Sequence, residues 1–114
     1  MALTVVNSGT QACTVGSEHT LITVTAAAVY QLGLDLTNLA GGATPDILEV
    51  WAYGKLTSGG SELALQPFPG SFVGAQGSKL WFSLPLSAAH SLKCAIKQVQ
   101  GSGRSIPWAL WKHG

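Results

Sequence analysis

The sequence predicts a single all-β domain, a β-sandwich or jelly roll of about seven or eight short antiparallel strands. Apolar and polar residues alternate with a period of two in several runs, which is typical of strands that bury one face. Segments rich in glycine, serine and proline separate these runs at close spacing, and no credible long helix is visible. A chain of 114 residues has room for one domain with its own hydrophobic core.

The composition indicates a surface that is unusually short of charge. Charged residues make up 10% of the chain and hydrophobic residues 46%, whereas ordinary soluble domains carry roughly 25% charged residues. The formal net charge is only +1, and a net charge near zero promotes association. We therefore expect other subunits to cover much of the surface, and we expect a homo-oligomer or a larger assembly.

Patterning argues against nucleic-acid and membrane partners. The basic residues are scattered between Lys55 and Lys112, whereas nucleic-acid binders usually cluster them on one face. No run approaches the ~18 apolar residues of a membrane span. Residues 1–4 lack the basic and apolar regions that open a signal peptide. We therefore expect synthesis and assembly in a cytoplasm.

Residues 1–17 are predicted to form an N-terminal strand or arm ahead of the main β-sandwich at 18–114. Two short strand candidates, Leu3–Asn7 and Gln11–Val15, lie on either side of a break at Asn7-Ser8-Gly9. An extended arm fits equally well, because neither run is long enough to define a core face.

The next two strands are predicted at 19–25 and 29–36. The first is rich in β-branched residues, which favour strands. The second places four large side chains on one face: Tyr30, Leu32, Leu34 and Leu36. The alanines at 26–28 favour a helix by propensity, but the strand pattern directly after them favours a short connection. Residues 37–45 are predicted as a loop.

The longest predicted strand runs from Ile47 to Thr57. Alternation divides it into an inner face of Leu48, Val50, Ala52 and Leu56 and an outer face of Glu49, Trp51, Tyr53 and Lys55. A turn at 58–61 and a return at 63–68 complete a predicted hairpin.

Residues 79–86 are predicted as one further strand. Alternation directs Leu80, Phe82, Leu84 and Leu86 inward and Trp81 outward. Because Pro85 cannot donate a ladder hydrogen bond, the end of this strand is predicted at a sheet edge.

The last quarter of the chain, 91–111, predicts a hairpin. Its first strand buries Leu92, Cys94 and Ile96, and the glycines at 101 and 103 accept the positive φ that a reversal needs. The return places Ile106, Trp108 and Leu110 on one side and Ala109 and Trp111 on the other. Because Pro107 lacks an N–H group, this return strand is predicted to be an edge or to bulge there.

The two cysteines, Cys13 and Cys94, leave their pairing open. Their number permits one disulfide, but a reducing compartment favours free thiols. Cys94 is in phase with Leu92 and Ile96, where a free cysteine behaves as a small core residue. The position of Cys13 is ambiguous.

No motif predicts an enzyme. A G-x-S-x-G elbow is absent, and Gly101-Ser102-Gly103 lacks the Gly-Lys-Ser/Thr that completes a phosphate loop. No cysteine or histidine spacing fits a zinc site. Asp35 and Glu49 fall on predicted outer faces, where solvation explains them. We therefore expect a non-enzymatic protein with no catalytic, metal-binding or cofactor-binding residues and no cofactor.

Three aromatic residues on predicted outer faces, Trp51, Tyr53 and Trp81, suggest a contact surface. Clustered exposed aromatics mark interaction sites, and aromatics are enriched at interface hot spots. The alternative is a second layer of core, or a bulge that shifts the phase. With Arg104 and Trp111, these residues are the interface candidates.

Several segments resemble a group of small tailed-bacteriophage virion proteins. Those chains end in an L-K-Q-x-x-G-x-G-R-x-x-P-W pattern. The matching residues here are Leu92-Lys93, Ile96-Lys97-Gln98, Gly101-Ser102-Gly103-Arg104-Ser105 and Ile106-Pro107-Trp108. Residues 18–25 and 46–55 fit the same group, so the resemblance covers most of the chain from Glu18 onward.

The resemblance implies a virion structural protein, most simply a capsid decoration or cement protein that binds and stabilises the shell. The implied partners are the major capsid protein, neighbouring copies of this chain, or both, in a virion assembled in the host cytoplasm. The place of Arg104 in the motif implies a structural role for that residue. The alternative is a tail, fibre or baseplate component whose β-sandwich binds a carbohydrate or receptor.

Overall fold

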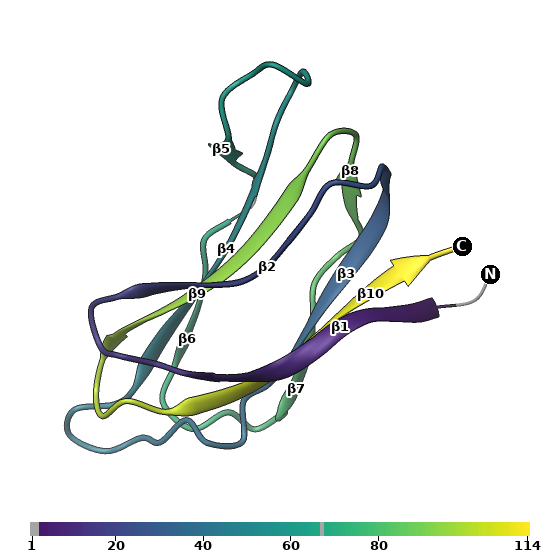
Figure 1. The fold of residues 1–114 in the computed structure, drawn as a ribbon. Coiled ribbons are helices and arrows are strands. Elements are labelled where there is room, and N and C mark those ends of the chain that lie inside the picture. The colour runs from purple at the N-terminus through teal and green to yellow at the C-terminus, as the bar shows by residue number, and fades with distance from the viewer. Residues whose placement is uncertain (1–2, 67) are drawn as a thin grey trace.

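The computed structural model describes residues 3–66 and 68–114, and every regular element within them is a β-strand. The strands are β1 (Leu3–Ala12), β2 (Glu18–Val24), β3 (Ala28–Asp35), β4 (Ile47–Gly54), β5 (Leu63–Ala64), β6 (Gly70–Val73), β7 (Leu80–Phe82), β8 (Leu86–Ala88), β9 (Leu92–Gln100) and β10 (Ser105–His113). They form two antiparallel five-stranded sheets that pack face to face (Figure 1). The predicted all-β sandwich is therefore confirmed.

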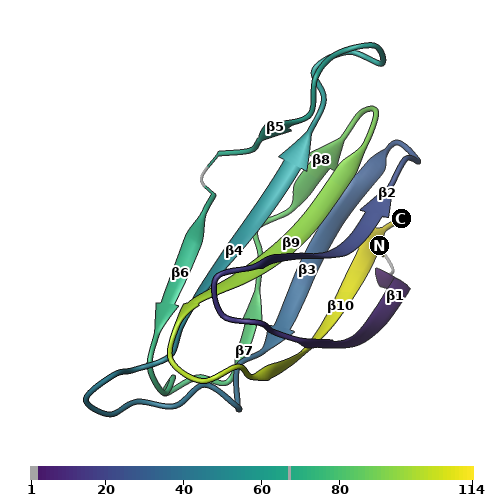
Figure 2. The same ribbon diagram turned by 60° about the vertical axis from the view of Figure 1, so that its left-hand side comes forward.

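The strand order is that of a jelly roll. Sheet A runs β1-β10-β3-β7, with β8 also paired to β3, and sheet B runs β2-β9-β4-β5, with β6 also paired to β4. The first strand thus pairs with the last and the second with the ninth, as in an antiparallel ribbon folded over on itself. The views in Figures 1 and 2 both place the start of β1 beside the end of β10, where Leu3 pairs with His113.

The strands are more fragmented than predicted, but the strand positions agree. Both β5 and β6 pair with β4, and both β7 and β8 pair with β3. The two strands of each pair, β5 with β6 and β7 with β8, lie one after the other along the same neighbouring strand and together take the place of one strand. The ten strands therefore occupy eight strand positions in the two sheets.

The core lies between the two sheets and is formed largely by the residues that the clearest alternations predicted to be buried. Tyr30, Leu32, Leu34 and Leu36 are each at most 2% exposed, and Leu48, Val50 and Ala52 at most 1%. Leu92, Cys94 and Ile96 of β9 and Ile106 and Leu110 of β10 are fully buried. These residues form one continuous cluster, so the inward phase predicted for β3, β9 and most of β4 is correct. For β10, the structure shows that the side with Ile106 and Leu110 faces the core.

Two predicted boundaries on β4 and β1 are wrong. β4 ends at Gly54, and Leu56, predicted inward, is 89% exposed on the following loop. Conversely, β1 continues from Leu3 through Asn7-Ser8-Gly9 to Ala12. The register with β10 shifts at a bulge between Val5 and Asn7 and is regular from Asn7 to Ala12. Pairing with β10 therefore overrides the turn propensity of Asn7-Ser8-Gly9.

The strand predicted at 79–86 is two strands, and most of its predicted phase is inverted. β7 ends at Phe82, and Ser83 turns into the core, where its Oγ accepts the N–H of Leu32 at 3.0 Å. Pairing resumes only at Leu86, which is buried as predicted. The break shifts the alternation by one residue. Leu80, Phe82 and Leu84 are therefore 66%, 54% and 74% exposed, and Trp81 packs against the core.

β10 is not an edge strand, contrary to the prediction from Pro107. It lies between β1 and β3. The ladder with β3 begins at Trp108, so Pro107 lies one residue outside it and interrupts no pair with β3. The register with β1 also passes through Thr10 and Pro107 without a bulge at the proline.

Candidate interaction surfaces

The outer surface of sheet A carries a continuous group of apolar side chains, which we call the apolar face. It comprises Leu80 and Phe82 of β7 and Pro107, Ala109 and Trp111 of β10, on either side of β3. These side chains and Gly33 line a shallow groove of about 240 Å³. Asp35 is the single charged residue among the groove's lining residues.

Gly33 gives the apolar face its shape. It pairs with Phe82 on one side and Ala109 on the other. A Cβ added at Gly33 would lie 2.9 Å from Cε1 of Phe82, so the ring lies directly over the glycine backbone. Glycine here allows an aromatic ring from the edge strand to lie flat on the central strand, as an aromatic commonly covers a glycine across a sheet.

The outer surface of sheet B, which we call the mixed face, carries aromatic and charged side chains together. Trp51 and Tyr53 of β4 are half-buried, and their rings stack with centroids 5.9 Å apart and an interplanar angle of 8°. Lys93, opposite Tyr53 on β9, places Nζ 4.5 Å from the centroid of that ring. The structure therefore places these two candidates outward, as the alternation predicts.

The polar groups of the mixed face bond to one another. Tyr53 donates its hydroxyl to Glu18 at 2.7 Å, Trp51 donates Nε1–H to Glu49 at 3.2 Å, and Lys93 pairs with Glu62 at 3.0 Å. Burial, together with the hydrogen bond to Glu18, raises the pKa of Tyr53 to about 12. Tyr53 is therefore a neutral donor at ordinary pH.

The two outer surfaces differ sharply in charge. Three of the five acidic residues and two of the six basic residues lie on or beside the mixed face: Glu18, Glu49, Glu62, Lys93 and Lys97. None of the five residues of the apolar face is charged, and Asp35 is the one charged residue that lines its groove. Burying the apolar face against a partner would therefore desolvate few charges.

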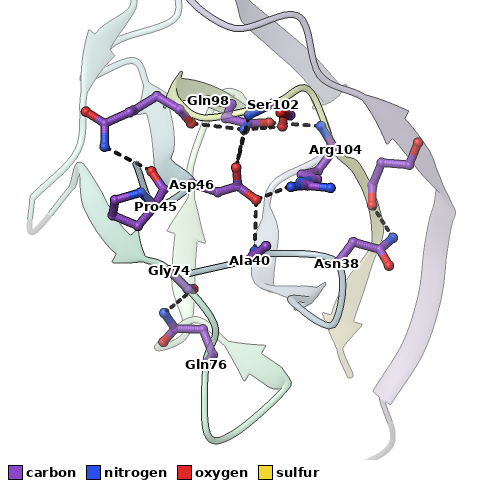
Figure 3. A network of polar contacts seen from close by, with 11 residues as sticks. Asn38, Ala40, Pro45, Asp46, Gly74, Gln76, Gln98, Ser102 and Arg104 are labelled. Atoms are coloured by element: carbon purple, nitrogen blue, oxygen red, sulfur yellow. Dashed lines mark hydrogen bonds and ion pairs between the residues drawn. The ribbon is translucent and has the colours of Figure 1, made fainter. Parts of the chain in front are cut away.

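Arg104, an interface candidate, is engaged within the chain (Figure 3). Its Nε donates to Oδ2 of Asp46 at 2.7 Å, and Asp46 is 2% exposed. The same oxygen accepts the N–H of Ala40 at 2.8 Å, and Oδ1 accepts the N–H of Ser102 at 3.1 Å. This ion pair ties the loop before β4 to the β9–β10 turn.

Burial and hydrogen bonding act in opposite directions on Asp46. Burial would raise the pKa of its carboxyl group, but the bonds from Ala40, Arg104 and Ser102 together hold the pKa below its ordinary value. Gly101, with φ of 95°, leaves room for the carboxylate, because a Cβ there would collide with Asp46. Gln98 completes the network by accepting the N–H of Arg104 at 3.0 Å.

Trp81, predicted outward, instead faces the interior. It lies opposite the buried Leu34, and its ring meets Phe72 of sheet B edge-on with centroids 5.5 Å apart. It therefore closes the side of the sandwich between β7 and β6. The apolar residues that do face outward on β7, Leu80 and Phe82, were predicted inward. Ser83 and Pro85 are the sequence signals of the break that reverses them.

The two cysteines are unpaired in the fold. Cys13 and Cys94 are free and buried. Burial raises the pKa of both thiols, and that of Cys94 to about 12. Throughout residues 3–66 and 68–114, no group of three or more histidine, cysteine, aspartate or glutamate side chains is arranged to hold a metal ion. The same part of the chain includes no helix that is long and apolar enough to cross a membrane.

Comparison with known proteins finds no match: no family model, no curated protein and no solved structure matches this chain.

Proposed function

We propose that this chain is a non-enzymatic structural protein of a bacteriophage virion, and that it binds the capsid shell through the apolar face and stabilises it. The observation that carries the proposal is the uncovered apolar groove between Phe82 and Trp111, on a chain with 10% charged residues. Exposed apolar surface of this kind is characteristic of protein interfaces.

The mechanism is burial of surface without chemistry. The rings of Phe82 and Trp111 flank the groove and offer two aromatic anchors, and a single anchor of this type contributes about 2 kcal/mol or more at an interface. A copy that bridges neighbouring capsid subunits would stabilise the assembled shell relative to free subunits, because a ligand that binds one state more tightly shifts the equilibrium toward that state.

The resemblance of the closing segment to small tailed-phage proteins supports the same assignment. In this chain the residues of that segment build the β9–β10 hairpin and the Arg104–Asp46 ion pair. The segment therefore stabilises the strand that supplies Pro107, Ala109 and Trp111. Jelly rolls recur in viral capsid domains, although a fold by itself does not determine a function.

The experiment measures particle occupancy. Trp111→Ser and Phe82→Ser variants should fold but fill fewer sites on particles, since each removes an anchor while leaving the core unchanged. Leu56→Ser is the matched control, because Leu56 is 89% exposed and lies outside the apolar face. Full occupancy by both anchor variants would overturn the apolar face as the docking surface.

A second candidate function, a tail or fibre component that binds a glycan, is favoured by one observation. Parallel Trp51 and Tyr53 rings beside carboxylates and lysines match the chemistry that stacks on sugar rings and bonds to hydroxyls. The polar groups there are already bonded to one another, so a glycan would have to replace those bonds. Loss of glycan binding in Trp51→Ala, with normal particle occupancy, would favour this function over capsid docking.

A further inference from the structure

β1 forms one edge of sheet A and is the longest strand in the described part of the chain. It pairs with β10 from Leu3 to Ala12, and no other strand within residues 3–66 and 68–114 pairs with its far side. Figures 1 and 2 show it as the purple ribbon that borders the sheet. Ten residues at about 3.4 Å each make an edge roughly 30 Å long.

The pairing with β10 determines which backbone groups point toward the free edge. Thr10 lies opposite Pro107, which has no N–H and cannot form a hydrogen-bonded pair. Three residues further on, Cys13 donates its N–H to the carbonyl of Arg104 at 2.8 Å. Bonded and non-bonded pairs alternate in an antiparallel ladder. Odd-numbered positions from Asn7 to Cys13 therefore bond to β10, and the even-numbered positions Ser8, Thr10 and Ala12 direct their N–H and C=O groups away from it.

Ser8 is consistent with this phase. Its N–H is bonded to the side-chain oxygen of the preceding residue, Asn7, at 2.9 Å. The carbonyl of Ala12 is likewise occupied, because it accepts Nε2–H of Gln11 at 2.9 Å. The regular part of the edge therefore presents both backbone groups of Thr10, the C=O of Ser8 and the N–H of Ala12 to an incoming strand.

β1 lacks the features that normally protect an edge. Natural sheets protect their edges with charged residues, proline, bulges or very short strands. β1 contains no charged residue and no proline, and its bulge lies ahead of the regular stretch. The other edge elements are shorter: β5 to β8 have two to four residues, and β2 carries Glu18 and His19.

β1 is also accessible from both faces. Gln11 is half-buried, and every other residue of the strand is exposed. Leu3, Val5 and Val6 are 50%, 44% and 40% exposed, because sheet B barely reaches this strand. Within the described residues, sheet B therefore leaves room for a further strand beside β1.

We propose that the free edge of β1 pairs antiparallel with β1 of a second copy of this chain. The backbone edge of a strand is complementary to itself across a two-fold axis, so an identical strand fits without any new feature. A strand that carried charge would repel its own copy there, and β1 carries none. The net charge of +1 adds little long-range repulsion between copies.

The pairing has a geometric consequence for the apolar face. A two-fold axis that relates antiparallel strands in one sheet stands perpendicular to that sheet. The apolar faces of the two copies therefore lie on the same side of a continuous ten-stranded sheet, twice the five strands of one copy. The dimer itself does not depend on the proposed function, but the doubled docking face does.

Hydrogen exchange and mass measurement on the full chain test the pairing. The wild-type chain should be a dimer in solution, and dilution should speed exchange of the Thr10 and Ala12 amides by on the order of tenfold or more. Gly9 and Gln11 are the internal control, because their amides bond to β10 in monomer and dimer alike. A monomer at all concentrations, or equal behaviour of the four amides, would overturn the proposal.

Substitution at Thr10 locates the contact. Thr10→Pro and Thr10→Lys should weaken dimerisation on the order of tenfold or more, while the melting temperature confirms the fold. Thr20→Lys is the matched control, since Thr20 is an exposed threonine on β2, the edge strand of sheet B. A dimer that survives both Thr10 variants, or that is weakened equally by Thr20→Lys, would contradict pairing through β1.

The same variants separate this inference from the proposed function. Dimer loss in Thr10→Pro together with retained particle binding supports β1 pairing and leaves capsid docking intact. A stable β1 dimer that binds no particle supports the pairing and removes the capsid role.

Discussion

Arg104 and Asp46, 58 residues apart in the chain, form an ion pair of 2.7 Å that joins the start of β4 to the start of β10. Asp46 is 2% exposed, whereas the side chain of Arg104 is 34% exposed. The guanidinium therefore neutralises a buried carboxylate from the protein surface. This contact fixes the β9–β10 turn relative to sheet B and gives the first prediction.

Arg104→Gln should destabilise the fold by about 3 kcal/mol, because the buried Asp46 carboxylate loses its only cationic partner among the described residues. It keeps only neutral donors there, such as the N–H groups of Ala40 and Ser102. Chemical denaturation of the isolated chain measures the change. Lys112→Gln is the control, since Lys112 lies exposed on the same strand and should change stability by no more than about 0.5 kcal/mol. Equal losses in both variants would show that the ion pair contributes nothing specific.

Acid should destabilise the protein through Asp46. Its folded-state pKa lies below the ordinary value of 3.8, so its contribution is present above that value and is lost as the pH falls through the folded-state pKa. Asp35 has a lowered pKa from its bonds to Thr37 and acts in the same direction. Asp46 is buried and accepts bonds from a guanidinium and from two backbone N–H groups, whereas Asp35 is half-buried and accepts bonds from Thr37. The free energy of unfolding, measured from pH 5 downward, should therefore fall less steeply with pH in Asp46→Asn than in Asp35→Asn. The reverse order would contradict the dominant role of Asp46.

The thiols of Cys13 and Cys94 should resist alkylation in the folded protein at pH 8 and react after denaturation without reductant. Burial raises the pKa of both thiols, that of Cys94 to about 12, and so removes the reactive thiolate. Mass spectrometry of the alkylated chain counts the modified sites. Rapid labelling of Cys94 in the native state would show that β9 opens readily.

Trp81→Ala should cost more stability than Trp51→Ala. Trp81 packs against the core and Phe72, so its truncation should cost about 3 kcal/mol. Trp51 stacks with Tyr53 on the outer surface of sheet B, and loss of such an aromatic pair costs about 1 kcal/mol beyond the lost burial. Thermal unfolding of both variants compares them. A larger loss for Trp51→Ala would mean that the mixed face is part of the core.

The sequence alone predicts the sandwich and most of its core. The alternations at Tyr30 to Leu36 and at Leu92 to Ile96 assign the buried side chains correctly, because each run is long and uninterrupted. It also places Trp51 and Tyr53 outward, as the alternation of β4 requires.

The sequence could not predict the surface that we propose for binding. Residues 79–86 show one uninterrupted alternation in sequence, which predicts that Leu80 and Phe82 face inward. The structure instead buries Ser83, and the neighbouring Leu80 and Phe82 therefore face outward. The pairing of Arg104 with Asp46 was equally hidden, since nothing local links positions so distant in the chain.

Tertiary structure also decided which strands are edges. The proline at 107 predicted an edge, yet β10 is central and β1 is the edge. The local alternation of apolar and polar residues indicates which face of a sheet a residue occupies. Side chains alternate along a strand regardless of which strands lie beside it. Strand order depends on which backbone groups find partners far along the chain, and a residue's own neighbours in sequence do not specify those partners.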